Sequence, residues 1–346
     1  MAVAAELRAS GAEVSFLGTR EKIEAELVPT AGYEIDFLKV RGIDRKNPLR
    51  AARAGLEAVG AVVAARSALR RRGADVVMGG GGYVAGPAGL AATLSGTPLV
   101  LTEADSHLGL ANRLLARRAR RVCLAFPIAG REGERYLVTG RPVPARILAA
   151  DRETARRRFG IPSEARCLFV VGGSQGARSV NFAAVEAFAE RDGRDFRVLH
   201  LSGRRDHEEL ERRLMAAPHR DGYTLIDYDP DGLADFLAAA DLVLGRSGGS
   251  IFEVTAAGRP AILVPYPHAT GDHQSANAAW MERAGAATVL PDSALGDAVG
   301  AERLRAEVAA ILGEDGKLGA MAAASRALAK PDAARRIADE VLAAAR

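Results

Sequence analysis

The chain has few cysteines, few aromatic residues and no long apolar run. Its two cysteines, Cys123 and Cys167, both fall in apolar segments, so we expect buried, reduced thiols and no metal site built from them. No apolar stretch approaches the roughly 18 residues that a membrane-spanning helix requires. The N-terminal sequence MAVAAELRAS has neither the basic start nor the apolar core of a signal peptide. These features predict a soluble, cytoplasmic globular protein.

Aromatic residues are sparse, with one Trp, six Tyr and ten Phe, and they are not interleaved with basic residues. We therefore expect no nucleic-acid partner. The charge is uneven: residues 1–145 carry 21 Lys and Arg against 14 Asp and Glu, a net of +7, and the remainder carries a net of −3. Arginines gather in the first half at Arg70, Arg71, Arg72, Arg113, Arg117, Arg118, Arg120 and Arg121. Such a basic face fits an anionic membrane surface, with a merely solvated face as the alternative.

A length of 346 residues suits two domains rather than one core. Short apolar strands alternate with helical patterns throughout. The strands are expected at 11–19, 33–40, 75–78, 98–102, 121–126, 136–139, 167–172, 195–202, 223–228, 241–245, 261–266 and 286–290. The alternation predicts an α/β fold with two doubly wound parallel sheets. Gly140–Pro144 interrupts it, so we place the domains at 1–144 and 145–346, with a ligand cleft between them.

Two glycine-rich turns follow buried strands and precede helices rich in small residues. One is Gly172–Gly176, after the strand at Cys167–Val171, and the other is Gly79–Gly86, before a helix at 87–94. Glycines allow a tight turn and close approach to a ligand, and the N–H groups at a helix start favour an anion. A plain connection between strand and helix is the alternative for either turn. Their occurrence in both halves favours two phosphate-binding turns.

Two further polar segments follow strands of the second half. Arg246–Glu253 opens a helix with glycines and serines, and Glu253 lies in its first turn, where a carboxylate can accept both hydroxyls of a ribose. A capping box between Ser250 and Glu253 explains the same residues without a ligand. Pro265–Asn277 carries His, Asp, Gln and Asn side chains at a density that favours a sugar or nucleotide contact.

These segments occur in the order and at the strand ends found in one family, and the chain resembles the MurG glycosyltransferases from its first residue to its last helix. The matching segments are Gly81–Pro87, Val171–Arg178 with Asn181, Glu253, His268–Asn277 and Pro331–Ala334. The resemblance implies the GT-B architecture, two Rossmann-like domains facing across a cleft, with the donor in the C-terminal domain. The last helix is expected to pack back on the N-terminal domain.

The resemblance also implies the reaction. MurG enzymes move N-acetylglucosamine, with inversion at the anomeric carbon, from UDP-N-acetylglucosamine to undecaprenyl-diphosphate-linked muramoyl-pentapeptide, the lipid I to lipid II step of peptidoglycan synthesis. They are peripheral proteins of the cytoplasmic face of the cell membrane, and no cofactor or metal is implied. The Asp-x-Asp pattern in Asp227–Asp231 resembles a metal motif of another fold, but an acidic turn containing Pro230 is the favoured explanation.

Carried over by position, the resemblance assigns the substrate contacts. The donor diphosphate falls to Gly173, Ser174, Gln175 and Gly176 and to the helix start at Gly249 and Ser250. Glu253 takes the ribose, while His273 and Gln274 take the sugar hydroxyls. Gly81, Gly82 and Tyr83 belong to the acceptor diphosphate loop. Asp105 stands where the family has an asparagine that contacts the donor, and the residue that reads the uracil stays open.

The beginning of the sequence departs from the family. MurG proteins start with a strand and a Gly-Gly-Thr-Gly-Gly-His loop, and this sequence opens inside the helix expected to follow them. We expect a start codon placed too late, with a partner that supplies the piece as the alternative. Because the family's histidine base lies in that loop, Asp105 and Glu103 are the candidate bases.

Two other functions stay open from the sequence. A GT-B relative could act on another acceptor, as a glycolipid synthase or a UDP-sugar epimerase does. The chain could also be an inactive or half-enzyme subunit that needs a partner.

Overall fold

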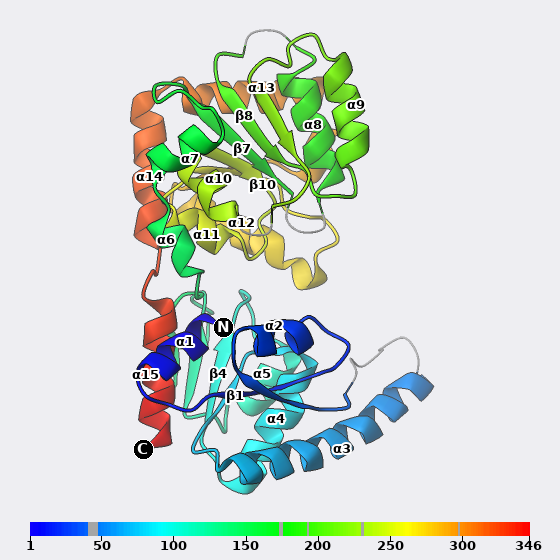
Figure 1. Cartoon of the computed structure of the whole chain (residues 1–346), viewed down its shortest axis with the longest axis vertical. Coiled ribbons are helices and arrows are strands. Elements are labelled where there is room, and N and C mark those ends of the chain that lie inside the picture. Colours follow the sequence, from blue (N-terminus) through cyan, green and yellow to red (C-terminus); the bar gives the residue numbers. More distant parts are fainter. Residues whose placement is uncertain (41–47, 173–175, 192–193, 230–231, 297) are drawn as a thin grey trace. The chain divides into compact units, whose positions relative to one another are not determined.

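The computed structural model describes residues 1–40, 48–172, 176–191, 194–229, 232–296 and 298–346. The chain divides into two compact units (Figure 1): Met1–Pro142 with Asp332–Arg346, and Val143–Pro331. The expected boundary lay after residue 144. No helix within these described ranges is both long and apolar enough to cross a bilayer.

The first unit holds two parallel sheets and the helices around them. Its elements are α1 (Ala2–Ala9), β1 (Ser15–Gly18), α2 (Glu24–Thr30), β2 (Glu34–Phe37), α3 (Pro48–Arg72), β3 (Val77–Gly79), α4 (Gly82–Ser95), β4 (Leu99–Glu103), α5 (Leu110–Leu115), β5 (Arg121–Leu124), β6 (Tyr136–Val138) and α15 (Ala333–Ala345). The strand orders are β1-β2 and β3-β4-β5-β6. Among the described residues, the six strands of this unit thus pair in two parallel sheets.

The C-terminal helix α15 belongs to the first unit. Its apolar residues Ile337 and Val341 share a buried cluster with Val3 and Leu7 of α1 and with Cys123 of β5. α15 also packs against β4. The last helix thus returns to complete the core that the N-terminal segment begins.

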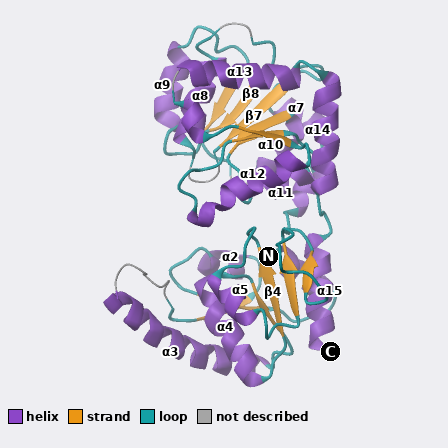
Figure 2. Cartoon of the chain, turned by 180° about the vertical axis from the view of Figure 1, so that it is seen from behind, coloured by secondary structure: helices purple, strands orange, loops and turns teal. Residues whose placement is uncertain are grey.

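The second unit is one six-stranded parallel sheet flanked by helices (Figure 2). Its elements are α6 (Ala145–Ala149), α7 (Arg152–Arg158), β7 (Cys167–Val171), α8 (Arg178–Phe188), β8 (Arg197–Leu201), α9 (His207–Ala216), β9 (Tyr223–Ile226), α10 (Leu233–Ala239), β10 (Leu242–Gly245), α11 (Ile251–Ala256), β11 (Ala261–Leu263), η1 (Thr270–Asp272), α12 (His273–Arg283), β12 (Ala287–Val289), η2 (Asp292–Leu295), α13 (Ala298–Leu312) and α14 (Asp315–Leu328). The strand order β12-β11-β10-β7-β8-β9 reverses between β7 and β10. In such a sheet, ligands bind beyond the carboxyl ends at this reversal.

Apolar runs explain why the central strands form. Every residue of β7 and β10 is buried, as expected for strands covered on both faces by helices. The two cysteines are free and buried, which confirms that prediction. Burial raises the pKa of the Cys123 and Cys167 thiols to about 12.

One sequence-based placement is corrected. The helix predicted at 87–94 begins at Gly82, so Gly82 and Tyr83 lie in its first turn rather than in a preceding loop, and Pro87 lies inside the helix. The helix that ends the polar segment, α12, begins at His273, as the helical pattern at 273–284 predicts.

Several arginines of the first unit's basic cluster pair with carboxylates. Arg121 lies in β5, and its Nε lies 2.8 Å from Glu340 of α15. Arg71 and Arg72, at the end of α3, pair with Asp36. These arginines are therefore partly neutralised by the unit's own carboxylates.

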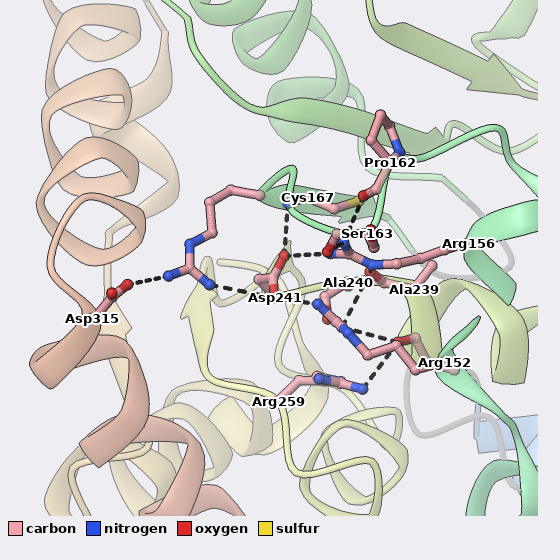
Figure 3. A network of polar contacts seen from close by, with 12 residues as sticks. Arg152, Arg156, Pro162, Ser163, Cys167, Ala239, Ala240, Asp241, Arg259 and Asp315 are labelled. Atoms are coloured by element: carbon pink, nitrogen blue, oxygen red, sulfur yellow. Dashed lines mark hydrogen bonds and ion pairs between the residues drawn. The ribbon is translucent and has the colours of Figure 1, made fainter.

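A buried carboxylate at the amino end of β10 gathers several arginines (Figure 3). Asp241 is 8% exposed, and its oxygens lie 2.6 Å from Arg152 Nη2 and 2.8 Å from Arg156 Nη2. Asp241 also accepts the backbone N–H of Cys167 at 2.9 Å. The same arginines donate to carbonyls at the end of α10, which have no partner within the helix. Arg259 donates to carbonyls there too, and burial lowers its pKa to about 10.

Asp241→Ala is expected to lower the free energy of unfolding of the second unit by about 3–5 kcal/mol, because it leaves buried guanidinium groups without their anion. Unfolding in urea can be followed through Trp280, the only tryptophan, in α12. Asp315→Ala is the matched control: Asp315 pairs with Arg166 in the same network but is 85% exposed, so it should cost under about 1 kcal/mol. Equal losses in the two variants would contradict the role given to Asp241.

Candidate functional site

The turn after β7 requires its glycines. A Cβ on Gly172 would lie 2.3 Å from the backbone nitrogen of Ala177, and Gly176 adopts a φ of +73°. Gly173, Ser174 and Gln175 lie outside the described residues. The turn leads directly into α8, whose unpaired N–H groups at its start favour an anion.

The turn after β10 is fixed to α12. Ser247 Oγ donates to the Gln274 carbonyl at 2.8 Å, and Asn277 Nδ2 donates to the Ser247 carbonyl at 2.9 Å. Ser250 is the residue preceding α11, and its side chain makes no capping hydrogen bond. The capping-box explanation is therefore wrong for Ser250. Gly249 lies in the turn before α11, next to Ser250. Glu253 lies in the first turn of α11 and is half-buried.

His273 and Gln274 are the first residues of α12. Gln274 Oε1 accepts the backbone N–H of Tyr266 at 3.0 Å, which ties the start of α12 to the loop after β11. Just before the helix, Gly271 and Asp272 both have positive φ values, 64° and 52°. A positive φ at a non-glycine residue is uncommon, so this turn is closely specified by its surroundings.

Arg246 joins the carboxyl ends of β10 and β11 to the starts of α8 and η2, and the sequence alone gave it no role. Its Nη1 lies 2.5 Å from Asp292 Oδ1 and 3.1 Å from the Val264 carbonyl, and its Nη2 lies 2.9 Å from Ser179 Oγ. One guanidinium therefore links β10, β11, α8 and η2. Its only sequence signal is an arginine immediately after a buried strand.

A stacked pair lies at the ends of β8 and β9. The Arg204 guanidinium lies 4.4 Å from the centroid of the Tyr228 ring, and both side chains are exposed. The pair offers a flat surface at the carboxyl edge of the sheet, and contacts of this kind also suit planar ligands. The sequence alone assigned no role to Arg204 or Tyr228.

In the first unit, Glu103 holds the loop after β4. It is 7% exposed, and its carboxylate accepts from Gly109 N at 2.8 Å, Asn112 Nδ2 at 2.9 Å and Asp105 N at 3.2 Å. Asp105 is exposed, and so is His107, which the sequence analysis passed over. The sequence signal for His107 is its position two residues after the candidate carboxylate Asp105.

The second glycine turn lies beside this loop. Gly81 precedes α4 with a φ of 81°, and Gly82 follows with 76°. Thr102 Oγ1 donates to the Gly79 carbonyl at 3.3 Å, and a Cβ on Gly81 would lie 3.7 Å from Asn112 Nδ2. The structure thus brings Gly81 and Gly82 close to the loop that Glu103 holds.

Metal ligation has no candidate here. Among the residues that the structure describes, no group of three His, Cys, Asp or Glu side chains could hold a metal ion.

Two Rossmann-like units with glycine turns at the carboxyl edges of parallel sheets define a GT-B glycosyltransferase. The family model for the glycosyltransferase family 28 N-terminal domain matches residues 1–124, and that for the C-terminal domain matches residues 167–337. The chain is 41% identical over 340 residues to the UDP-N-acetylglucosamine--N-acetylmuramyl-(pentapeptide) pyrophosphoryl-undecaprenol N-acetylglucosamine transferase of Moorella thermoacetica, covering 96% of this chain and 91% of the relative.

Two further comparisons agree. The enzyme of the same name from Rubrobacter xylanophilus is 39% identical over 348 residues, 99% of each chain. The crystal structure of Acinetobacter baumannii MurG superposes with a TM-score of 0.81 at 29% identity, covering 99% of this chain and 94% of that one. The chain belongs to the MurG family of glycosyltransferases.

Replacing each candidate carboxylate of the first unit should show which of the two stabilises the fold and which does not. Glu103→Gln is expected to cost about 1–3 kcal/mol of unfolding free energy, because the amide cannot accept all three N–H groups. Asp105→Asn should stay within about 0.5 kcal/mol, as exposed substitutions do. Differential scanning calorimetry measures both. A larger loss for Asp105→Asn than for Glu103→Gln would reverse the two roles.

Proposed function

We propose that this chain transfers N-acetylglucosamine from UDP-N-acetylglucosamine to undecaprenyl-diphosphate-linked muramoyl-pentapeptide, forming lipid II from lipid I. The relatives from Moorella thermoacetica and Rubrobacter xylanophilus, which the chain matches over 91% and 99% of their lengths, are named for these two substrates. The observation in the structure that supports the proposal best is the pair of turns after β7 and β10, which open α8 and α11 on neighbouring strands. Such a pair suits a nucleotide diphosphate.

The second unit is the proposed donor site. The leaving UDP gains negative charge, which the start of α8 stabilises through its N–H groups and helix dipole. Gly173, Ser174, Gln175 and Gly176 would meet the diphosphate together with Gly249 and Ser250. Glu253 would accept the ribose hydroxyls, His273 and Gln274 would hold the sugar, and Tyr228 with Arg204 offers a stacking surface for the uracil.

The first unit is the proposed acceptor site. Gly81, Gly82 and Tyr83 would lie against the acceptor diphosphate at the start of α4. The acceptor hydroxyl must lose a proton as its oxygen attacks the anomeric carbon and the bond to UDP breaks. Of the two candidate bases, Asp105 is preferred because the Glu103 carboxylate is already occupied by three N–H donors.

An assay with labelled UDP-N-acetylglucosamine and a lipid-linked muramoyl acceptor tests the function. The expected product is the disaccharide lipid, formed without added metal. Parallel reactions without acceptor, and with diacylglycerol as acceptor, test the epimerase and glycolipid-synthase alternatives. Transfer only to another acceptor, or epimerisation of the donor, would overturn the proposal.

Glu253→Ala should raise the donor KM while leaving the acceptor KM near normal, because Glu253 lies in the second unit. A lost hydrogen bond to a charged group is worth about 1.5–3 kcal/mol, and Ser174→Ala should act in the same direction. Glu282→Ala, which alters an exposed carboxylate of α12, is the control and should leave both constants unchanged. A donor KM in Glu253→Ala equal to that of the wild-type protein would contradict the proposed contact between Glu253 and the ribose.

We also propose that the first unit docks on an anionic membrane at the cytoplasmic face. α4 and α5 pack together and leave leucines exposed beside their contact, with Leu94 at 58% and Leu114 at 65%. Leu90 and Leu110 precede them by four residues, one helical turn, and are exposed as well. Arg113, Arg117, Arg118 and Arg120 are exposed in and after α5. Apolar side chains bordered by arginines suit a lipid surface with anionic headgroups.

Replacing Arg117, Arg118 and Arg120 with Gln should weaken binding to phosphatidylglycerol vesicles roughly 100-fold, at about 1 kcal/mol per charge. Cosedimentation with sucrose-loaded vesicles measures the partition coefficient. The control replaces Arg212, Arg283 and Arg303, three exposed arginines of the second unit, and should leave binding unchanged. Equal losses in both triple variants would mean that net charge, not this face, governs binding.

A further inference from the structure

A buried polar chain runs beneath the glycine turn that follows β7. His200 of β8 is fully buried, with its Nδ1 2.7 Å from the Tyr223 hydroxyl and its Nε2 3.0 Å from Asn181 Oδ1. Asn181 lies in the first turn of α8, and its Nδ2 donates to the Ser202 carbonyl at 2.9 Å and to Asp206 Oδ2 at 3.1 Å. The chain therefore connects β9, β8 and α8 with the turn after β8.

The partners of Asn181 fix the direction of each hydrogen bond. A carbonyl and a carboxylate only accept, so the Asn181 amide nitrogen faces them and its oxygen faces His200. Nε2 of His200 therefore carries the proton, and Nδ1 accepts from the Tyr223 hydroxyl. Burial, with a smaller contribution from His207, lowers the pKa of His200 to about 3, so the ring is neutral at physiological pH.

The chain ends where two turns meet. A Cβ on Gly176 would lie 3.1 Å from the Ser202 carbonyl, the same carbonyl that Asn181 holds. The backbone N–H of Asn181 donates to the Ala177 carbonyl at 2.8 Å, so the side chain and the backbone of one residue fix both turns. Burying a polar group costs free energy unless the group is hydrogen-bonded. The packing of β8 in its sheet does not by itself require these polar side chains.

We propose that His200 is a positioning residue for the donor: through Asn181 it holds Gly176 and the start of α8 at the spacing from the turn after β8 that the donor diphosphate requires. The inference rests on the proposed function of this turn. His200 does not touch substrate in this role. Its effect should therefore appear in donor affinity rather than in the chemical step.

The test compares variants that keep or remove the donor to Asn181. His200→Leu removes it and should raise the donor KM and the UDP dissociation constant roughly tenfold, with kcat and acceptor KM nearly unchanged. His200→Gln, whose amide can still donate to Asn181, should recover most of the affinity. Tyr223→Phe keeps the His200–Asn181 bond and should have the smaller effect. Unchanged UDP affinity in His200→Leu, measured by calorimetry, would overturn the proposal.

A matched control separates positioning from general loss of stability. Leu304 is fully buried in α13 of the same unit, so Leu304→Ala should lower the melting temperature without changing UDP affinity. If it weakens UDP binding as much as His200→Leu does, the effect belongs to stability and the inference fails.

A spectroscopic readout tests the hydrogen-bond direction independently of activity. Nitrogen-15 NMR of labelled histidines should show His200 as a neutral Nε2–H tautomer at neutral pH. An Nδ1–H tautomer would overturn the proposal. Absence of turnover in the wild-type protein would instead count against the proposed function. In that case, calorimetry of UDP binding to the wild-type protein and to His200→Leu would still test the role of His200.

Discussion

The close approach of β7 and β10 at their carboxyl ends governs the arrangement of the second unit. Gly245 pairs with Val171, and a Cβ at Gly245 would lie 2.5 Å from the Val171 carbonyl oxygen. Only glycine permits that approach, and it lets the turns opening α8 and α11 begin side by side at the point where the strand order reverses. The contacts from Ser247, Asn277 and Arg246 then hold the surrounding loops in place.

The two edges of this sheet use charge differently. At the amino edge, Asp241 takes up arginines that also cover the carbonyls ending α10, so positive charge is neutralised inside the fold. At the carboxyl edge, Asp292 is matched by Arg246, and His200 is neutral. This balance favours the diphosphate site that we propose at this edge, because an unpaired carboxylate there would oppose an anionic ligand.

The sequence predicted where the strands lie, but it did not predict the side-chain contacts of the candidate site. Each expected strand is observed, because buried parallel strands read as continuous apolar runs. The start of α4 was missed because the glycines before Pro87 are typical of a loop, whereas the helix begins at Gly82. The partners of Arg246, Glu103 and His200 could not be predicted, since they lie far apart in sequence or across turns whose geometry no local pattern specifies. Fold class and family therefore followed from the sequence, while the division of roles within the site required the structure.

The loop after β4 shows how such a division arises from hydrogen bonding alone. Glu103 and Asp105 are equivalent in the sequence, two carboxylates at one strand end. Folding turns Glu103 inward, where the N–H groups of Gly109 and Asn112 occupy its lone pairs. A carboxylate held in this way orders the loop, because its oxygens already accept hydrogen bonds from the loop and from α5. The same bonds leave Asp105 exposed on that ordered loop, and our proposal of Asp105 as the base rests on this difference between the two carboxylates.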